Sequence, residues 1–103
     1  MTYYDVITQP RAERDIEAAY RWLAEQAPAA ANEWFDGISD ALDSLGEMPE
    51  RCPIAPEAKH FKQEVRHLLF GAYRIIFAVE ERHVRVITVR HASRKPLRRP
   101  PRA

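Results

Sequence analysis

The chain is poor in cysteine and glycine. Cys52 is the only cysteine, so no disulfide can form within the chain, and a reduced cytoplasmic location is the simplest expectation. The three glycines, Gly37, Gly46 and Gly71, are scattered along the sequence, whereas a loop that cradles phosphate needs several glycines close together. The sequence therefore predicts neither a disulfide scaffold nor a nucleotide-binding fold.

Long apolar runs and clustered metal ligands are also missing. No apolar stretch approaches the roughly 18 residues that a membrane-spanning helix needs, and no secretory signal pattern opens the chain. The four histidines lack the close pairing and the cysteine or carboxylate partners of a recognisable metal site. No metal, cofactor or membrane partner is therefore expected. With 103 residues, 46% of them hydrophobic, the chain is large enough for one domain with its own core.

Negative and positive charges are segregated along the chain. Residues 1–50 contain three arginines and eleven carboxylates, whereas residues 51–103 contain thirteen Lys or Arg and four carboxylates. The net charges of these two parts are thus −8 and +9. Two interpretations remain open. The charges are the solvated faces of two acidic helices and a basic sheet, or the basic part forms a surface that attracts nucleic acid or an acidic protein segment.

The hydrophobic pattern predicts an α+β domain. Apolar residues recur at steps of three and four in two segments separated by Pro28, which is typical of an antiparallel helical hairpin. β-branched and aromatic residues dominate four other segments, which indicates an N-terminal strand and a three-stranded antiparallel meander in one sheet. The expected strands are residues 2–8, 61–70, 73–80 and 84–91, and the expected helices contain residues 12–23 and 31–45.

Several residues have expected positions within this arrangement. Thr8 is expected to cap the first helix, and Trp34 and Phe35, at helical spacing, are expected to pack in the core. Residues 48–57 contain three prolines and are expected to form a stiff, irregular linker. Residues 1–95 are expected to form the domain, and residues 96–103 a disordered, basic and proline-rich tail.

Cationic residues interrupt the apolar strands. An arginine inside such a strand needs an anionic partner, so Arg74 is expected either to pair with a carboxylate of the chain or to hold an anionic ligand. Histidine and arginine could also supply the proton acceptor, the proton donor and the positive charge for metal-independent cleavage of RNA, or they could serve binding alone. The candidate catalytic residues are Arg74, His91 and Arg94, and the candidate target-binding residues are Arg66, His67 and Arg90.

Several short motifs follow one another in a specific order along nearly the whole chain. They are residues 8–16 at the start of the first helix, Trp34, Ile38, Leu42 and Leu45 on the second helix, residues 49–53 in the linker, Val65-Arg66 and Tyr73-Arg74-Ile75 on strands, and His91 with Arg94. In their order and spacing the motifs resemble the RelE/ParE superfamily of toxins from bacterial type II toxin–antitoxin modules, also labelled plasmid stabilisation proteins. The resemblance implies growth inhibition, the same α+β fold and a cognate antitoxin that covers the toxin.

The resemblance leaves the cellular target open between two branches of the superfamily. ParE-like members poison DNA gyrase, and RelE-like members cut mRNA in the ribosomal A site. Arg74 matches the arginine that holds RNA phosphate in RelE-like enzymes, and His91 lies near a histidine used by some nuclease branches. However, no tyrosine follows Tyr73, and Val65 and His67 stand where RelE has lysines. The ParE branch is therefore favoured, with a ribosome-dependent endoribonuclease as the alternative and a nucleic-acid-binding module as a third hypothesis.

Overall fold

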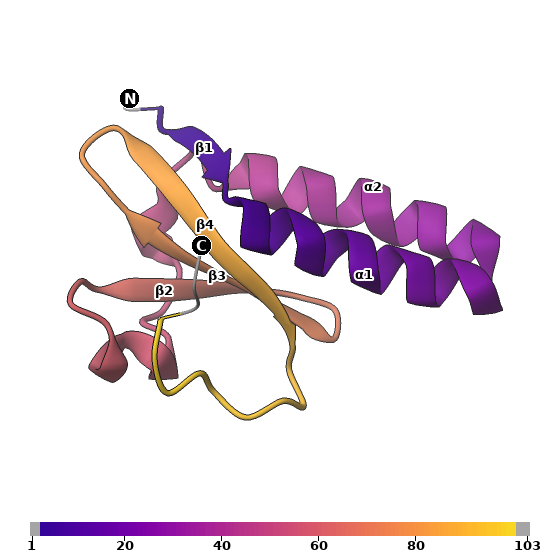
Figure 1. Cartoon of the computed structure of the whole chain (residues 1–103). Helices are drawn as coiled ribbons and strands as arrows, with labels where there is room; N and C mark the ends of the chain where they lie inside the picture. The colour runs from indigo at the N-terminus through magenta and orange to yellow at the C-terminus, as the bar shows by residue number, and fades with distance from the viewer. Residues whose placement is uncertain (1–2, 101–103) are drawn as a thin grey trace.

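The computed structural model describes residues 3–100 and has the α+β architecture that the sequence predicts (Figure 1). One strand is followed by two helices, two short 3-10 helices and three further strands. The bounds are β1 Asp5–Thr8, α1 Pro10–Gln26, α2 Pro28–Ser44, η1 Pro49–Arg51, η2 Pro56–His60, β2 Val65–Phe70, β3 Tyr73–Val79 and β4 His83–His91. The helical hairpin extends beyond the sheet, and the segment after β4 turns back across it (Figure 1).

Prolines set the starts of both long helices. Pro10 and Pro28 lie in the first turn, where a missing N–H removes no helical bond. Ala27, between the helices, has φ -154° and ψ 84°, outside the helical region, so the chain reverses there. The prediction that Thr8 caps α1 is wrong: Thr8 still belongs to β1, Gln9 is the N-cap, and no side chain caps the helix. In the described part of the chain, neither helix has the length and apolarity needed to cross a membrane.

The four strands form one mixed sheet in the order β1-β4-β3-β2. β1 pairs with β4 in parallel, and the other neighbouring strands are antiparallel, so the predicted meander is confirmed. Gly71 and Ala72 join β2 to β3, and Gly71 has a φ of 55°, which glycine adopts without steric cost. A register shift leaves Ile87 of β4 without a partner in β3. Such a bulge increases the local twist of the sheet.

Each face of the sheet carries an apolar core. On the helix face, which α1 and α2 cover, Phe77 packs with Ile16 and Ile38. On the loop face, which η2 and the residues after it cover, a smaller cluster contains Ile76 and Ile87. Successive strand residues point to opposite faces, which is why the neighbours Ile76 and Phe77 belong to different clusters. The buried charged residues Glu57, Arg74 and Arg90 lie on the loop face.

The segment before β2 differs most from the sequence prediction. Two 3-10 helices, each beginning at a proline, occupy much of the part expected to be irregular, because proline fixes φ within the helical range. β2 begins at Val65 rather than at residue 61, since Phe61 packs against the loop-face cluster instead of continuing the strand. The other strands begin or end within three residues of the expected positions, and residue 2, the expected start of the first strand, lies outside the described part of the chain.

The two neighbouring aromatic residues of α2 have different environments. Trp34 packs against the helix-face core and lies with its ring centroid 5.3 Å from that of Tyr73. Phe35 is 45% exposed, so the prediction that it packs in the core is wrong. Consecutive helical residues point roughly 100° apart, and only Trp34 faces the sheet.

Residues 96–100 have no regular secondary structure, yet they are not detached from the domain. The N–H of Leu97 donates to Glu57 of η2 at 3.2 Å. The disorder expected for residues 96–103 stays a prediction, and residues 101–103 lie outside the described part of the chain.

Candidate target-binding site

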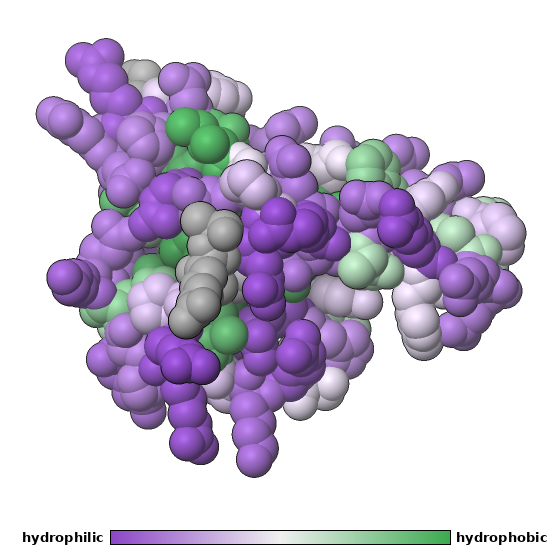
Figure 2. All heavy atoms as spheres, in the orientation of Figure 1, coloured by the Kyte–Doolittle hydropathy of each residue, from purple (hydrophilic) through white to green (hydrophobic). Residues whose placement is uncertain are grey.

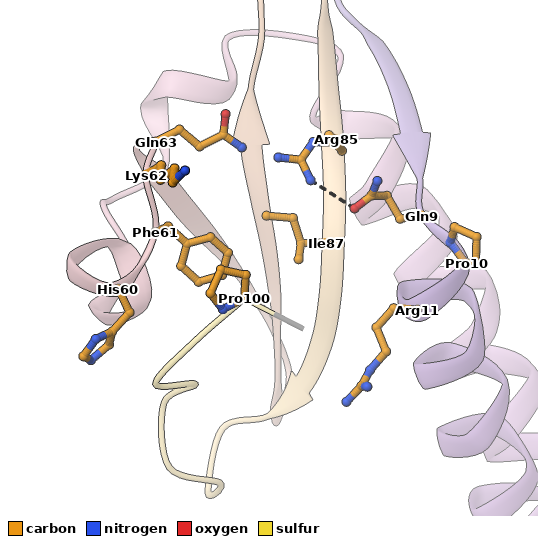
Figure 3. A pocket seen from close by; sticks show the side chains of 10 residues that line it. All are labelled: Gln9, Pro10, Arg11, His60, Phe61, Lys62, Gln63, Arg85, Ile87 and Pro100. Atoms are coloured by element: carbon orange, nitrogen blue, oxygen red, sulfur yellow. Dashed lines mark hydrogen bonds between the residues drawn. The ribbon is translucent and has the colours of Figure 1, made fainter. Parts of the chain in front are cut away.

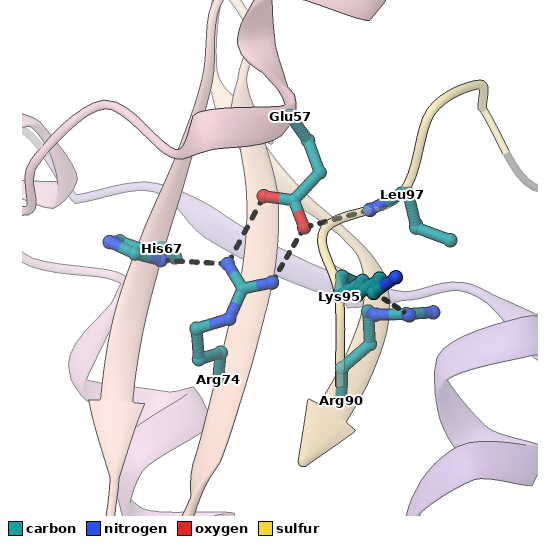
Figure 4. A network of polar contacts seen from close by, with 6 residues as sticks. All are labelled: Glu57, His67, Arg74, Arg90, Lys95 and Leu97. Atoms are coloured by element: carbon teal, nitrogen blue, oxygen red, sulfur yellow. Dashed lines mark hydrogen bonds and ion pairs between the residues drawn. The ribbon is translucent and has the colours of Figure 1, made fainter. Parts of the chain in front are cut away.

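Arg74 of β3 forms a buried ion pair with Glu57 of η2 on the loop face (Figure 4). The guanidinium donates from Nη1 to Oε1 at 3.1 Å and from Nη2 to Oε2 at 2.6 Å, which is the bidentate geometry of a strong arginine–carboxylate pair. Glu57 is fully buried, and Arg74 is 7% exposed. The sequence left two anionic partners open for Arg74, a carboxylate of the chain or an anionic ligand. In the structure, Arg74 pairs with a carboxylate of the chain.

His67 of β2 also binds the guanidinium of Arg74. Its Nδ1 atom lies 3.0 Å from Nη1 of Arg74. Because arginine only donates hydrogen bonds, Nδ1 accepts, and the ring is neutral with its proton on Nε2. Burial, and then the positive charge of Arg74, lower the pKa of His67 below its usual value. Both terminal nitrogens of Arg74 are therefore occupied by groups of the chain itself.

Glu57 connects three parts of the structure. Besides binding Arg74 of β3, its Oε2 atom accepts the hydrogen bond from the N–H of Leu97, so one carboxylate joins η2, the sheet and the C-terminal segment (Figure 4). Burial by itself would raise the pKa of Glu57. The hydrogen bonds and charge of Arg74, together with backbone donors, outweigh burial and hold this pKa below its usual value. Glu57 is thus an ionised carboxylate at neutral pH.

Arg90 of β4 pairs with Arg74 in the sheet register and lies on the same face. It is 8% exposed, and its Nη2 donates to the carbonyl oxygen of Lys95 at 2.7 Å. Its Nε is buried without a hydrogen-bond partner among the described residues. Burial, and then the charge of Arg94, lower the pKa of Arg90. Arg90 therefore gives the C-terminal segment its second anchor on the sheet.

His91 follows Arg90 in sequence but points to the opposite face of the sheet. Its ring meets the ring of Tyr73 edge to face, with a centroid distance of 5.2 Å, and its Nδ1 accepts from the N–H of Ser93 at 3.1 Å. His91 is exposed, as is Arg94 in the turn after β4. These two candidate residues are the ones that remain open to a partner.

Arg66 of β2 is separate from the other candidates. Its Nη1 donates to the carbonyl oxygens of Cys52 at 2.6 Å and Glu50 at 3.2 Å, and its Nη2 donates to Glu64 at 2.8 Å. These bonds hold η1 and the residues after it against the edge of the sheet. The predicted site residues therefore do not form one cluster. Arg74 and Arg90 are buried and His67 is half-buried near Glu57, His91 and Arg94 are exposed at the end of β4, and Arg66 holds a loop against the sheet edge.

Sequence reasoning missed Glu57. It lies 17 residues before Arg74, in a proline-rich segment without hydrophobic periodicity. One signal was available, because residues 51–103 contain only four carboxylates, and an arginine buried there had few possible partners. Nothing in the local sequence distinguishes Glu57 from the other three.

An apolar groove runs between α1 and α2. It contains a cavity of about 400 Å³ that is lined by Ile16, Tyr20, Phe35 and Leu42, among others. Phe35 packs edge to face against Tyr20, with the ring centroids 5.7 Å apart. Further along α1, Trp22 is 57% exposed. The hairpin therefore presents aromatic surface within an otherwise acidic part of the chain.

The chain has a strand, then a helical hairpin, then an antiparallel meander that shares one sheet with the first strand. This arrangement defines the toxin fold of the RelE/ParE superfamily that the sequence motifs resemble. Within that class, the chain belongs to the family of ParE toxins of the type II toxin–antitoxin system parDE, whose family model matches residues 6–96. The match reaches from β1 to the segment beyond β4. The sequence prediction of a ParE-like member is confirmed.

A solved structure has the same fold. It is described as the chromosomal ParDE TA system from P. aeruginosa, and its similar chain is 15% identical to this one. The similarity covers 88% of this chain and 98% of that chain, with a TM-score of 0.74. At this level of identity the likeness shows the fold alone. No curated protein matches the chain.

Proposed function

We propose that this toxin arrests bacterial growth by binding DNA gyrase, and that a cognate antitoxin neutralises it in the cytoplasm. Membership of the ParE family supports a toxin of a type II system. The observation that carries the choice of target is the environment of Arg74. Its guanidinium is buried and paired with Glu57, so it has a structural partner instead of a free face for an RNA phosphate.

The same geometry disfavours the alternative, a ribosome-dependent and metal-independent endoribonuclease. RNA cleavage needs positive charge at the phosphate, with a proton acceptor and donor within hydrogen-bond reach of the reacting atoms. Arg74 and His91 lie on opposite faces of the sheet, so they cannot act on one phosphate. A phosphate at Arg74 would also have to displace Glu57, and leaving a buried charge unpaired costs about 3–5 kcal/mol.

Exposed residues at the end of β4 are the proposed contact with gyrase. His91 and Arg94 are open to solvent, and the ring of Tyr73 packs edge to face against the ring of His91. Aromatic residues and arginine are the side chains most enriched in the energetically important centres of interfaces. His67, Arg74 and Arg90 have a structural role here: they stabilise the loop face and do not contact the target.

The groove between α1 and α2 is the proposed binding site of the antitoxin. An amphipathic helix binds such a groove through apolar residues at steps of three and four, and Ile16, Phe35 and Leu42 offer the complementary surface. Because this groove lies on the helical hairpin and His91 lies at the end of the sheet, the antitoxin would need a second segment to cover the gyrase contact directly.

Supercoiling by purified gyrase in the presence of the purified chain tests the target. We expect dose-dependent loss of supercoiling, and no cleavage of mRNA in a translating extract. His91→Ala and Arg94→Ala should weaken inhibition, whereas the matched variants His83→Ala and Arg82→Ala at the other end of β4 should not. Cleavage of mRNA on ribosomes with gyrase unaffected would replace this proposal by the nuclease.

A further inference from the structure

A pocket separate from the Glu57 network lies over β4 on the loop face (Figure 3). Its volume is about 470 Å³. The start of α1 forms one wall and the segment after η2 forms the other (Figure 3). Ile87 and Phe61 give the pocket an apolar floor, and Pro100 of the C-terminal segment borders it. Neither the ion pair of Glu57 nor the exposed His91 takes part in this pocket.

Positive charge surrounds the pocket. Arg11, Lys62 and Arg85 line it, and among the described residues no carboxylate does. Gln9 holds Arg85 in place by accepting from its Nη1 at 3.0 Å, and Glu80 lies 3.6 Å from its Nε, outside the lining. Lys62 is exposed. The combination of an apolar floor and a cationic rim points to a ligand that is anionic along one side and flat and apolar on another.

The N-terminus of α1 belongs to the same wall, through Pro10 and Arg11. The N–H of Glu13 donates to the carbonyl oxygen of Gln9 at 3.0 Å, so the amides of Arg11 and the residue after it precede the first helical bond. No side chain caps them, and unpaired amides at a helix start favour an anion. The side chain of Arg11 pairs with Asp15 at 3.3 Å, and Asp15 does not line the pocket.

Exposed cations continue beyond the pocket. Arg98 and Arg99 are exposed immediately before Pro100, and Figure 2 shows largely hydrophilic side chains around the C-terminal segment. The Glu57 network anchors the start of that segment through Leu97. Several positive charges around one pocket create a positive potential, which attracts a polyanion.

These features fit a single-stranded nucleic acid better than an acidic peptide. Proteins that bind single strands combine a positive groove for the backbone with an aromatic ring on which a base stacks, and Phe61 supplies the ring. An extended peptide usually binds by adding a strand to a sheet edge, but β4 is an interior strand between β1 and β3. We propose that this pocket binds single-stranded DNA or RNA, with phosphates at Arg11, Lys62 and Arg85 and one base against Phe61.

Fluorescence anisotropy with labelled oligonucleotides tests this proposal on the full chain. The probes are oligothymidylate and oligouridylate of about twelve nucleotides, within the usual site size of such proteins, titrated at several salt concentrations. With three phosphate contacts, we expect a slope of about −2 in a plot of log affinity against log salt. The stronger of the two probes identifies DNA or RNA as the preferred strand.

Two variants and a matched control locate the binding site. Lys62→Ala should make the salt slope shallower by about 0.7, and Phe61→Leu, which keeps the floor apolar, should weaken binding about tenfold through lost stacking. Lys59→Ala removes the same charge from an exposed residue of η2 outside the pocket and should leave the slope unchanged. Thermal melts check that all three variants fold as the parent does.

Three outcomes would overturn the proposal. They are no salt-dependent binding of either oligonucleotide, an equal loss for the Lys59 and Lys62 variants, and competition by polyglutamate as effective as competition by unlabelled oligonucleotide. The last would assign the pocket to an acidic protein segment. The proposal goes beyond gyrase binding and does not depend on it, because the anisotropy measurement contains no gyrase.

Discussion

Breaking the Glu57–Arg74 ion pair from one side should destabilise the fold strongly. Arg74→Met removes the charge but keeps much of the volume, and it leaves Glu57 as an unpaired carboxylate with no exposed surface. Removing one partner of a buried pair costs about 3–5 kcal/mol. A domain of this size has a total stability of about 5–15 kcal/mol, so the urea midpoint should fall substantially. Glu57→Leu should cost at least as much, because it also removes the acceptor for the N–H of Leu97.

The double variant Glu57→Leu/Arg74→Met is the matched control for this prediction. It leaves no buried charge at the pair, and replacing a buried ion pair by apolar groups of similar volume is often neutral or stabilising by about 1–4 kcal/mol. The double variant should therefore be more stable than either single variant. Urea melts of the four proteins measure the coupling between the two positions. Single-variant losses below about 1 kcal/mol, or losses that simply add, would refute the reasoning.

The same four proteins test whether Arg74 contacts the target. If its role is structural, the double variant should arrest growth as strongly as the parent at equal soluble expression. Each single variant should lose toxicity in proportion to the fraction that is unfolded. A double variant that folds normally and is harmless would instead place Arg74 in contact with the target, and it would revive the nuclease alternative.

Three further predictions concern stability. The folded-state pKa values of His67 and Glu57 lie below the ordinary values of 6.5 and 4.5, so the unfolded state binds more protons as the pH falls. Urea melts at different pH should therefore show full stability above about pH 6.5, a first decline below it and a second decline below about pH 4.5. His67→Asn should remove the first decline. Gly71→Ala should cost about 1–2 kcal/mol in urea melts, because the added Cβ meets nothing within 4 Å and the positive φ is the whole penalty; Gly71→Asn, which tolerates this φ, should cost less. In thermal or urea melts, Ile38→Ala should cost about 2–5 kcal/mol, and Leu42→Ala, at a partly buried position, should cost clearly less.

The helices and strands were predictable because local signals determine them. Pro10 and Pro28 begin helices, Gly71 permits a two-residue turn, and the apolar periodicity changes from about 3.6 to 2 between the two parts of the chain. The parallel pairing of β1 with β4 has no such signal, because its partners lie more than 70 residues apart in the sequence. Phe61 shows the same limit. Its sequence position predicts a strand residue, but its side chain packs against the loop-face core, so β2 begins only at Val65.

The candidate site was predictable only in part, and strand geometry explains which part. Arg90 and His91 are adjacent on one strand, so they must point to opposite faces of the sheet, and this much follows from the sequence. Which arginine is neutralised does not follow, because Glu57 reaches Arg74 through a loop whose path the local sequence does not determine. Once Glu57 binds Arg74, the cation that looked most suited to hold a phosphate becomes part of the scaffold. The exposed residues His91 and Arg94 at the end of β4 and the cations around Lys62 are then the ones available to partners. Because Glu57 neutralises Arg74 within the fold, the sheet leaves two other sets of exposed residues for partners, one at the end of β4 and one around the pocket of Lys62.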